Sequence, residues 1–133
     1  MANGPERTQP VLPGPPTATN RPTISTHVLD TERGLPAAGV HVTLYKLGTD
    51  SQPIRMTQAL TDGDGRVRDL LERPLAAGDY RLEFNLAGER QPGLSEDRFF
   101  RRLAVDLRIE DTSRSYHVPL LLASFSMTAY RGS

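Results

Sequence analysis

The chain has 133 residues, of which 37% are hydrophobic, a size and composition suited to one buried core and a single folded domain. Lysine plus arginine and aspartate plus glutamate number 16 each, so no net charge indicates a nucleic-acid or anionic-membrane partner. No apolar run reaches the ~20 residues of a membrane span, and the start lacks the apolar core of a signal peptide. Cysteine is absent, which excludes disulfides, thiolate nucleophiles and cysteine-based metal sites and favours a cytoplasmic location.

The first 22 residues are rich in proline and small polar side chains and contain almost nothing to bury. They predict a disordered or extended leader before a domain that covers residues 23–133. Residues 24–30 alternate in polarity, as expected for a strand that is buried on one face. Ile24, Thr26 and Val28 then lie inward, which places His27 on the opposite face.

Further alternating segments follow, separated by loops that are rich in glycine and proline. They predict strands over residues 40–47, 54–61, 66–70, 79–86 and 103–109. The stretch Asp62-Gly63-Asp64-Gly65 predicts a tight turn, because Asp-Gly pairs supply a positive φ at low cost. Residues 94–98 leave room for about one helical turn at most.

The end of the chain predicts a hairpin of strands over 115–122 and 124–130, joined around Ala123 and Ser124. Its core face comprises Val118, Leu120, Leu122, Phe125, Met127 and Ala129. The opposite face collects His117, Thr128 and Tyr130, polar groups that are costly to bury without partners, and is the candidate site. Pro119 predicts an edge or a bulge, because proline is disfavoured in a central strand. About eight short strands at this spacing predict an all-β sandwich.

Four stretches, in this order, resemble the 5-hydroxyisourate hydrolases, the transthyretin-related proteins of purine catabolism. They are residues 25–30 (STHVLD), 61–66 (TDGDGR), 116–122 (YHVPLLL) and 130–133 (YRGS). The resemblance covers residues 23–133. It implies a transthyretin-like two-sheet β-sandwich of about eight strands with one short helix, assembled as a homotetramer that is a dimer of dimers.

The resemblance also implies a site in the channel between the dimers. The catalytic residues are His27, Arg66 and His117, and the substrate-binding residues are Thr128, Tyr130, Arg131, Gly132 and Ser133. The implied reaction is hydrolysis of 5-hydroxyisourate to 2-oxo-4-hydroxy-4-carboxy-5-ureidoimidazoline, with no metal and no cofactor. Residues 127–129 read Met-Thr-Ala where the family usually has Tyr-Ser-Thr, so we expect altered packing there and a retained hydroxyl at Thr128.

The chemistry of these residue types suits such a reaction. A histidine, with an ordinary pKa of roughly 6.5, can activate water at neutral pH, and an arginine can stabilise the oxyanion and bind ring carbonyls. Taken alone, His27 and Arg66 are more often solvated residues, and His117 is as often a histidine satisfied inside an interface. The individual roles of the two histidines stay open.

Other interpretations are weaker. Asp62 and Asp64 suggest a calcium loop, but Arg66 stands where a third oxygen ligand belongs. Zinc bound by His27 and His117 would be opposed by the same arginine, and His41 matches no motif and is expected to be structural. A non-catalytic carrier of a small ligand remains the main alternative function, because fold alone does not exclude it. An accessory β-sandwich is a third class, which would have neither the ordered tail nor the outward histidine pair.

Overall fold

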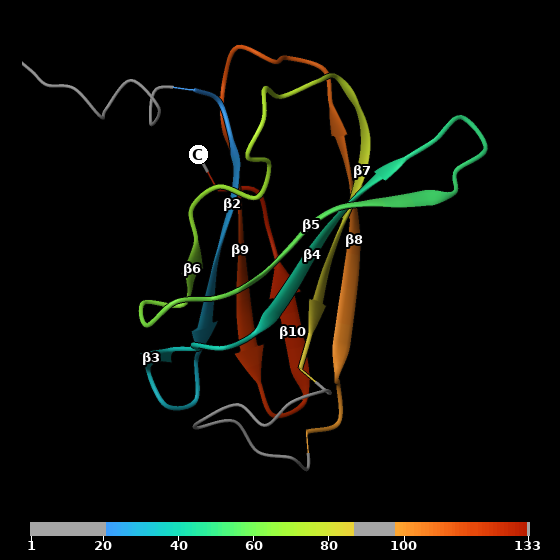
Figure 1. Ribbon diagram of the computed structural model, residues 1–133. Coiled ribbons are helices and arrows are strands. Elements are labelled where there is room, and N and C mark those ends of the chain that lie inside the picture. The colour runs from blue at the N-terminus through green and yellow to red at the C-terminus, as the bar shows by residue number, and fades with distance from the viewer. Residues whose placement is uncertain (1–20, 87–97, 133) are drawn as a thin grey trace, which may run out of the picture.

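The structure is a computed structural model that describes residues 21–86 and 98–132. Within these ranges the chain forms two β-sheets that face each other across one core (Figure 1). The strands are β2 (Ile24–Asp30), β3 (Leu35–Pro36), β4 (His41–Leu47), β5 (Pro53–Leu60), β6 (Arg66–Val67), β7 (Gly78–Asn85), β8 (Arg102–Ile109), β9 (Tyr116–Ala123) and β10 (Ser126–Ala129). The predicted all-β sandwich is confirmed.

The two sheets differ in how their strands pair. One sheet has the order β5-β4-β7-β8, and all its neighbours are antiparallel. The other has the order β10-β9-β2-β3, and β6 also pairs with β2. The central β2 and β9 are parallel, although they come from opposite ends of the chain. This pairing places Ser25 opposite His117 and His27 opposite Pro119, so both predicted catalytic histidines lie on neighbouring strands.

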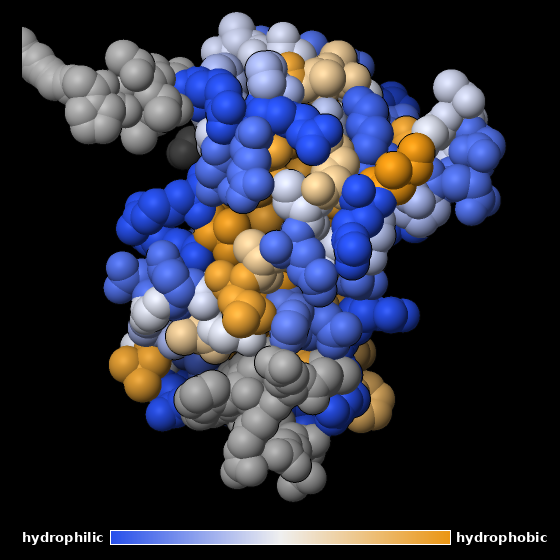
Figure 2. All heavy atoms as spheres, viewed as in Figure 1, coloured by the Kyte–Doolittle hydropathy of each residue, from blue (hydrophilic) through white to orange (hydrophobic). Residues whose placement is uncertain are grey.

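The core is made of alternate residues on the facing sides of the sheets, as the period of two predicted. The five-stranded sheet contributes Ile24, Val28, Val118, Leu120 and Leu122, and the four-stranded sheet contributes Val42, Leu44, Tyr80, Leu82 and Phe84. Figure 2 shows apolar surface gathered in a central strip between hydrophilic margins. Burial of each such side chain contributes roughly 1.5–3 kcal/mol, so this apolar packing is what fixes the outward direction of the residues between them.

The turn that precedes Arg66 brings β6 against β2. The Gly65 N–H donates to the Asp62 carbonyl at 2.9 Å, and the Asp62 N–H donates to the Arg66 carbonyl at 2.9 Å. Gly65 has a φ of +76°, and a Cβ there would lie 2.4 Å from the Val28 carbonyl oxygen. Only glycine therefore allows this close approach, which carries the chain from β5 in one sheet to β6 in the other.

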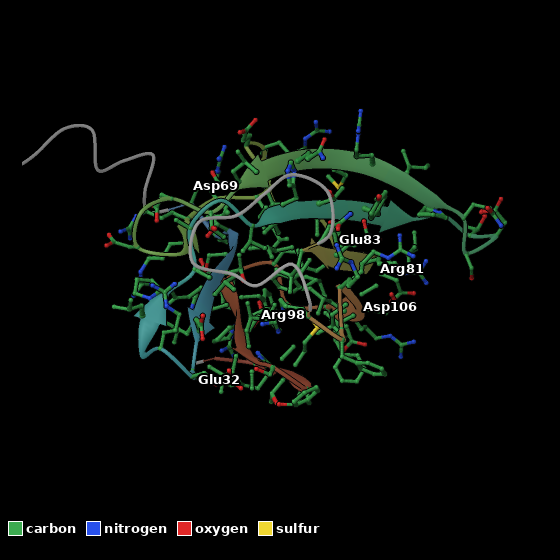
Figure 3. The ribbon with its side chains drawn as sticks, turned by 90° about the horizontal axis from the view of Figure 1, so that it is seen from below. Glu32, Asp69, Arg81, Glu83, Arg98 and Asp106 are labelled. Carbon is green, nitrogen blue, oxygen red and sulfur yellow. The ribbon has the colours of Figure 1, made fainter. Side chains whose placement is uncertain are left out.

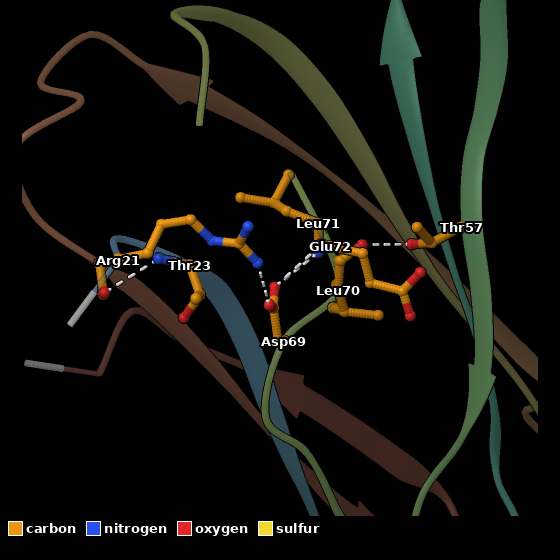
Figure 4. Close-up of polar contacts among 8 residues, drawn as sticks. Arg21, Thr23, Thr57, Asp69, Leu70, Leu71 and Glu72 are labelled. Atoms are coloured by element: carbon orange, nitrogen blue, oxygen red, sulfur yellow. Dashed lines mark hydrogen bonds and ion pairs between the residues drawn. The ribbon is translucent and has the colours of Figure 1, made fainter. Parts of the chain in front are cut away.

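The chain that leaves β6 is anchored at once, although the predicted strand over 66–70 is only two residues long. The Leu70 N–H donates to the Ile24 carbonyl at 2.9 Å, and the Thr57 hydroxyl donates to the Leu70 carbonyl (Figure 4). The Asp69 carboxylate accepts from the Leu71 N–H at 2.9 Å and from Arg21 Nη2 at 2.6 Å. These bonds hold the chain after β6 and the preceding turn holds the chain before it, so Arg66 projects from a defined position.

Two details of the terminal hairpin differ from the prediction. Phe125 was expected on the core face, but it lies in the β9–β10 turn and is 78% exposed. Pro119 is buried on β9, whose register with β2 is regular, so no bulge is present, and the ladder with β10 ends beside it. The Tyr130 N–H donates to the Pro119 carbonyl at 3.3 Å. Proline has no N–H that could donate to Tyr130 in return, and β10 ends at Ala129, one residue before Tyr130.

Two predictions fall outside the described residues. Residues 1–20 comprise nearly all of the predicted leader, and residues 94–97 comprise nearly all of the predicted helical turn. Arg98, the last residue of that turn, is irregular, and its Nη2 donates to the Ala123 carbonyl at 2.6 Å. Within the part of the chain that the structure describes, no helix is long and apolar enough to cross a membrane.

Candidate active site

The predicted catalytic residues meet on the outward face of the five-stranded sheet. His27 on β2 lies directly opposite Arg66 on β6 in the antiparallel register. His117 on β9 lies opposite Ser25, which is two residues before His27 on β2. All three predicted residues are half-buried, and residues two apart in a strand share a face. The structure therefore brings His27, Arg66 and His117 together on one surface.

His117 is held by a hydroxyl from the neighbouring strand. Its Nδ1 lies 2.9 Å from Ser25 Oγ, and the hydroxyl can either donate or accept in this hydrogen bond. With a proton on Nδ1 that is given to Ser25, the lone pair of Nε2 is available to a ligand. Ser25 thus fixes the ring orientation and leaves the second nitrogen for chemistry.

The surroundings of His117 favour the neutral imidazole. Burial lowers the pKa of His117 below its ordinary value of 6.5, and electrostatic interactions with Arg66 and with His27 lower that pKa further. A hydrogen bond with the Ser25 backbone acts in the opposite direction. The net shift favours the neutral imidazole, which can accept a proton.

Three hollows adjoin this surface and share its residues. A hollow of about 250 Å³ is lined by Ser25, Thr26, Arg66, Val67, Arg68 and His117. A second, of about 580 Å³, is lined by His27, Leu29, Pro36, Asp64, Arg66 and Arg68. The third, of about 320 Å³, lies between β8 and the β9–β10 end and includes His117, Tyr130 and Arg131. Arg66 joins the first two hollows, and His117 joins the first to the third.

The C-terminal tail runs along His117. The Gly132 N–H donates to the His117 carbonyl at 2.7 Å, and a Cβ at Gly132 would lie 2.9 Å from His117 Cδ2. The Arg131 guanidinium lies over the Tyr116 ring, 5.1 Å from its centroid, in a cation–π contact. Tyr130 is 51% exposed and lines the third hollow. The tail is therefore ordered through Gly132 by contacts with β9.

Two of the expected substrate-binding residues stand apart from this geometry. Thr128 is exposed on β10, opposite Leu121, and is not among the residues that line the three hollows. Ser133 lies outside the described residues. His41, expected to be structural, belongs to the other sheet.

Comparison with known proteins decides the family. The profile of the HIUase/Transthyretin family matches residues 24–132, which is most of the chain. The chain belongs to the HIUase/transthyretin family. A 5-hydroxyisourate hydrolase of Deinococcus radiodurans is 40% identical over 116 residues, covering 84% of this chain and 97% of the relative.

Solved structures of the HIUase/transthyretin family give the same fold. The 5-hydroxyisourate hydrolase of Klebsiella pneumoniae superposes with a TM-score of 0.68 at 30% identity, over 84% of this chain and 99% of that one. Sea bream transthyretin in complex with thyroxine superposes with a TM-score of 0.71 at 24% identity, over 82% of this chain and 93% of that one. The second likeness concerns the fold alone.

Sequence reasoning missed three residues that this member of the HIUase/transthyretin family places in the site. Ser25 binds a histidine that is 92 residues away, so no local pattern revealed the contact. Tyr116 carries the stacked Arg131, and the Arg114 guanidinium also lies 5.6 Å from its ring centroid. Arg68 lines two of the hollows, and its place two residues after Arg66 was the available signal.

The arrangement can support hydrolysis by acid–base chemistry. It offers two imidazoles, one of them with a lowered pKa, and a guanidinium with a planar set of donors. Within residues 21–86 and 98–132, no three His, Cys, Asp or Glu side chains are grouped so that they could hold a metal ion. The described groups are thus a base, a second imidazole and a cationic donor.

Proposed function

We propose that this chain hydrolyses 5-hydroxyisourate to 2-oxo-4-hydroxy-4-carboxy-5-ureidoimidazoline in the breakdown of urate. The observation that carries the proposal is the position of His117, held at Nδ1 by Ser25 and beside Arg66 in one hollow, where its pKa is lowered. Relatives support it, since the Deinococcus protein and a hydrolase of Salmonella typhimurium, 39% identical over 111 residues, are both 5-hydroxyisourate hydrolases.

The reaction adds water to a ring amide. The histidine pair takes a proton from water as its oxygen attacks the carbonyl carbon, and a proton is returned to the ring nitrogen as the C–N bond breaks. Arg66 binds the planar anion and stabilises the negative charge that develops on the carbonyl oxygen. The neutral state of His117 at pH 7 is what makes it competent to accept the first proton.

The C-terminal tail supplies one wall of the site. The hydrogen bond from Gly132 to His117 and the stacking of Arg131 on Tyr116 set the position of the tail beside the imidazole. Tyr130, Arg131 and Gly132 therefore limit where the substrate can lie relative to His117, and Ser133 stays an expected substrate-binding residue. Thr128 completes the same outward face of β10 and offers a hydroxyl toward a neighbouring subunit or the substrate.

We also propose a homotetramer, assembled as a dimer of dimers with sites between the dimers. Two features support it among the described residues: β8 and β10 are edge strands, and apolar side chains beside the polar set are partly exposed. Tyr130 is 51% exposed and Leu121 is half-buried on this face. An active monomer in light scattering at the assay concentration would contradict the tetramer.

The hydrolase activity is tested with freshly oxidised urate. Urate is converted by a urate oxidase, and the decay of the unstable intermediate is followed by ultraviolet absorbance with and without this protein. A hydrolase accelerates the decay in proportion to its concentration. A carrier would bind the intermediate without accelerating its decay, so an unchanged decay rate at micromolar protein would contradict the proposal.

A further inference from the structure

A second arginine, Arg68, follows directly after β6 and lies two residues beyond Arg66. Arg68 lines the 250 Å³ hollow with Arg66, Ser25 and His117, and it also lines the 580 Å³ hollow with Arg66 and His27. Residues two apart in extended chain point to the same side, which is why both guanidinium groups adjoin the same spaces. Arg68 itself is exposed at the mouth of both hollows.

Most other arginines of the described chain make an ion pair, a hydrogen bond or a ring contact through their guanidinium groups. Arg21, Arg81, Arg102 and Arg108 form ion pairs with carboxylates, and Arg114 and Arg131 stack on Tyr116. The guanidinium groups of Arg66 and Arg68 make no hydrogen bond or ion pair with any described residue. Their donors are available to a ligand.

The charges around the pair favour an anion in the smaller hollow. Asp64 lines the larger hollow, whereas no carboxylate is among the residues that line the smaller one. Asp62 interacts with both arginines through space, but its Oδ1 already accepts the N–H groups of Asp64 at 2.9 Å and Arg66 at 3.0 Å. The hydrogen bond from the Arg66 backbone lowers the pKa of Asp62, so this carboxylate stays charged and belongs to the turn.

We propose that Arg68 is a second substrate-binding residue, which binds the planar purine anion together with Arg66 in the carboxylate-free hollow beside His117. The inference rests on the proposed function and adds a binding role to a residue outside the expected catalytic set. Two planar forks can hold two edges of a ring that carries several carbonyl oxygens, which restricts its rotation in front of His117. An exposed cation at the mouth also raises the rate of encounter with an anion, an effect that salt screens.

The test compares Arg68→Gln and Arg68→Lys with a matched control, Arg73→Gln. Arg73 is exposed in the following loop and is not among the residues that line the three hollows, so its substitution removes the same charge from outside the site. The values of kcat and KM for 5-hydroxyisourate are measured for each protein at a series of ionic strengths from low to high. The wild-type protein is measured in parallel.

Arg68→Gln should raise KM about 3- to 10-fold, with a smaller change in kcat, and should flatten the fall of log kcat/KM with salt. Arg68→Lys should keep the salt dependence, because it keeps the charge, but should recover KM only in part, because it lacks the planar fork. Equal KM values and equal salt slopes for Arg68→Gln and Arg73→Gln would overturn the inference. No turnover by the wild-type protein would instead contradict the proposed function itself.

Discussion

The outward faces of the two sheets differ in whether their charged side chains are paired. On β7 and β8, outward charges are paired across strands, and Arg81 Nε donates to Asp106 Oδ1 at 2.7 Å (Figure 3). Arg108 Nε lies 3.4 Å from Asp79 Oδ1. On β2 and β9 the outward face holds the half-buried imidazoles, and on and after β6 it holds the guanidinium groups of Arg66 and Arg68, which form no ion pair with a described carboxylate. The paired face is satisfied by its own residues and water. The unpaired face is completed only when something else binds, which is why we assign the chemistry to it.

The largest expected effect comes from removing residues 130–133. This deletion removes the hydrogen bonds from Tyr130 to Pro119 and from Gly132 to His117, together with the stacked Arg131. We expect kcat/KM to fall by about 10²-fold or more, because the base loses the wall that orients it and the substrate. The free energy of unfolding should fall by no more than a few kcal/mol, because the deleted residues are not part of the buried core.

Circular dichroism with chemical denaturation measures the stability of the truncated protein, and the urate-intermediate assay measures its activity. A truncated protein that is folded and fully active would show that the ordered tail is structural. The site would then consist of residues on the sheet itself, namely His27, Arg66, Arg68 and His117.

A single substitution tests the contact between Gly132 and His117. Gly132→Ala adds a Cβ that would lie 2.9 Å from His117 Cδ2, so either the tail or the imidazole must shift. We expect kcat to fall about 10-fold or more, because displacement of a catalytic group by a fraction of an ångström is costly. The matched control is Gly63→Ala, where a Cβ would meet nothing within 4 Å. Equal kcat values for the two variants would contradict a positioning role of the tail.

Ser25→Ala should have a more modest effect. The substitution removes the partner of His117 Nδ1 and frees the ring to change its orientation and tautomer. We expect kcat to fall about 3- to 10-fold, the size expected for one lost hydrogen bond of about 1 kcal/mol. Nitrogen-15 chemical shifts of the His117 ring would report the change of tautomer directly.

The control for this change is Ser124→Ala, because the Ser124 hydroxyl donates to Glu32 at 2.6 Å in the β9–β10 turn. It removes a hydroxyl of the same kind at the other end of β9. If Ser124→Ala lowered kcat as much as Ser25→Ala, the effect would be one of general stability.

The smallest effect is expected on the paired face. Arg81 and Asp106 have side chains that are 36% and 55% exposed, so their ion pair is screened by water. A double-mutant cycle with Arg81→Gln and Asp106→Asn should give a coupling of about 0.2–1 kcal/mol in the free energy of unfolding. The value of kcat/KM should stay within about twofold of wild type, because neither Arg81 nor Asp106 lines the two hollows that contain Arg66. A large loss of activity would break the contrast between the two faces.

The sequence predicted correctly the residues whose inward or outward direction follows from the two-residue alternation of a strand. The alternation of residues 24–30 put Val28 inward and His27 outward, and the same rule put Leu120 inward and His117 outward. The strand bounds at 53–60 and 78–85 agree with the predictions to within one residue. Periodicity therefore predicted the sandwich and which face of each strand carries the site.

The contacts that the sequence did not predict depend on distant parts of the chain. The strand β6 has two residues, too few for any period, and its pairing with β2 depends on Gly65 passing close to Val28. Phe125 alternates in the sequence with Met127 and Ala129, as a core residue would. It lies in the two-residue turn between β9 and β10, however, where the alternation of a strand does not apply. Pro119 is tolerated in a central strand because β10 ends where the missing N–H would have donated. Family resemblance, and not any local pattern, named Arg66 as a partner of the histidines.

One comparison tests the assignment of the chemistry to the unpaired face most directly. The decay of 5-hydroxyisourate is measured with His117→Asn, from the unpaired face, and with His41→Asn, the same substitution in the other sheet. We predict that His117→Asn lowers kcat/KM by about 10²-fold or more, whereas His41→Asn stays within about threefold of wild type. Near-wild-type turnover by His117→Asn, with the protein folded, would contradict the assignment.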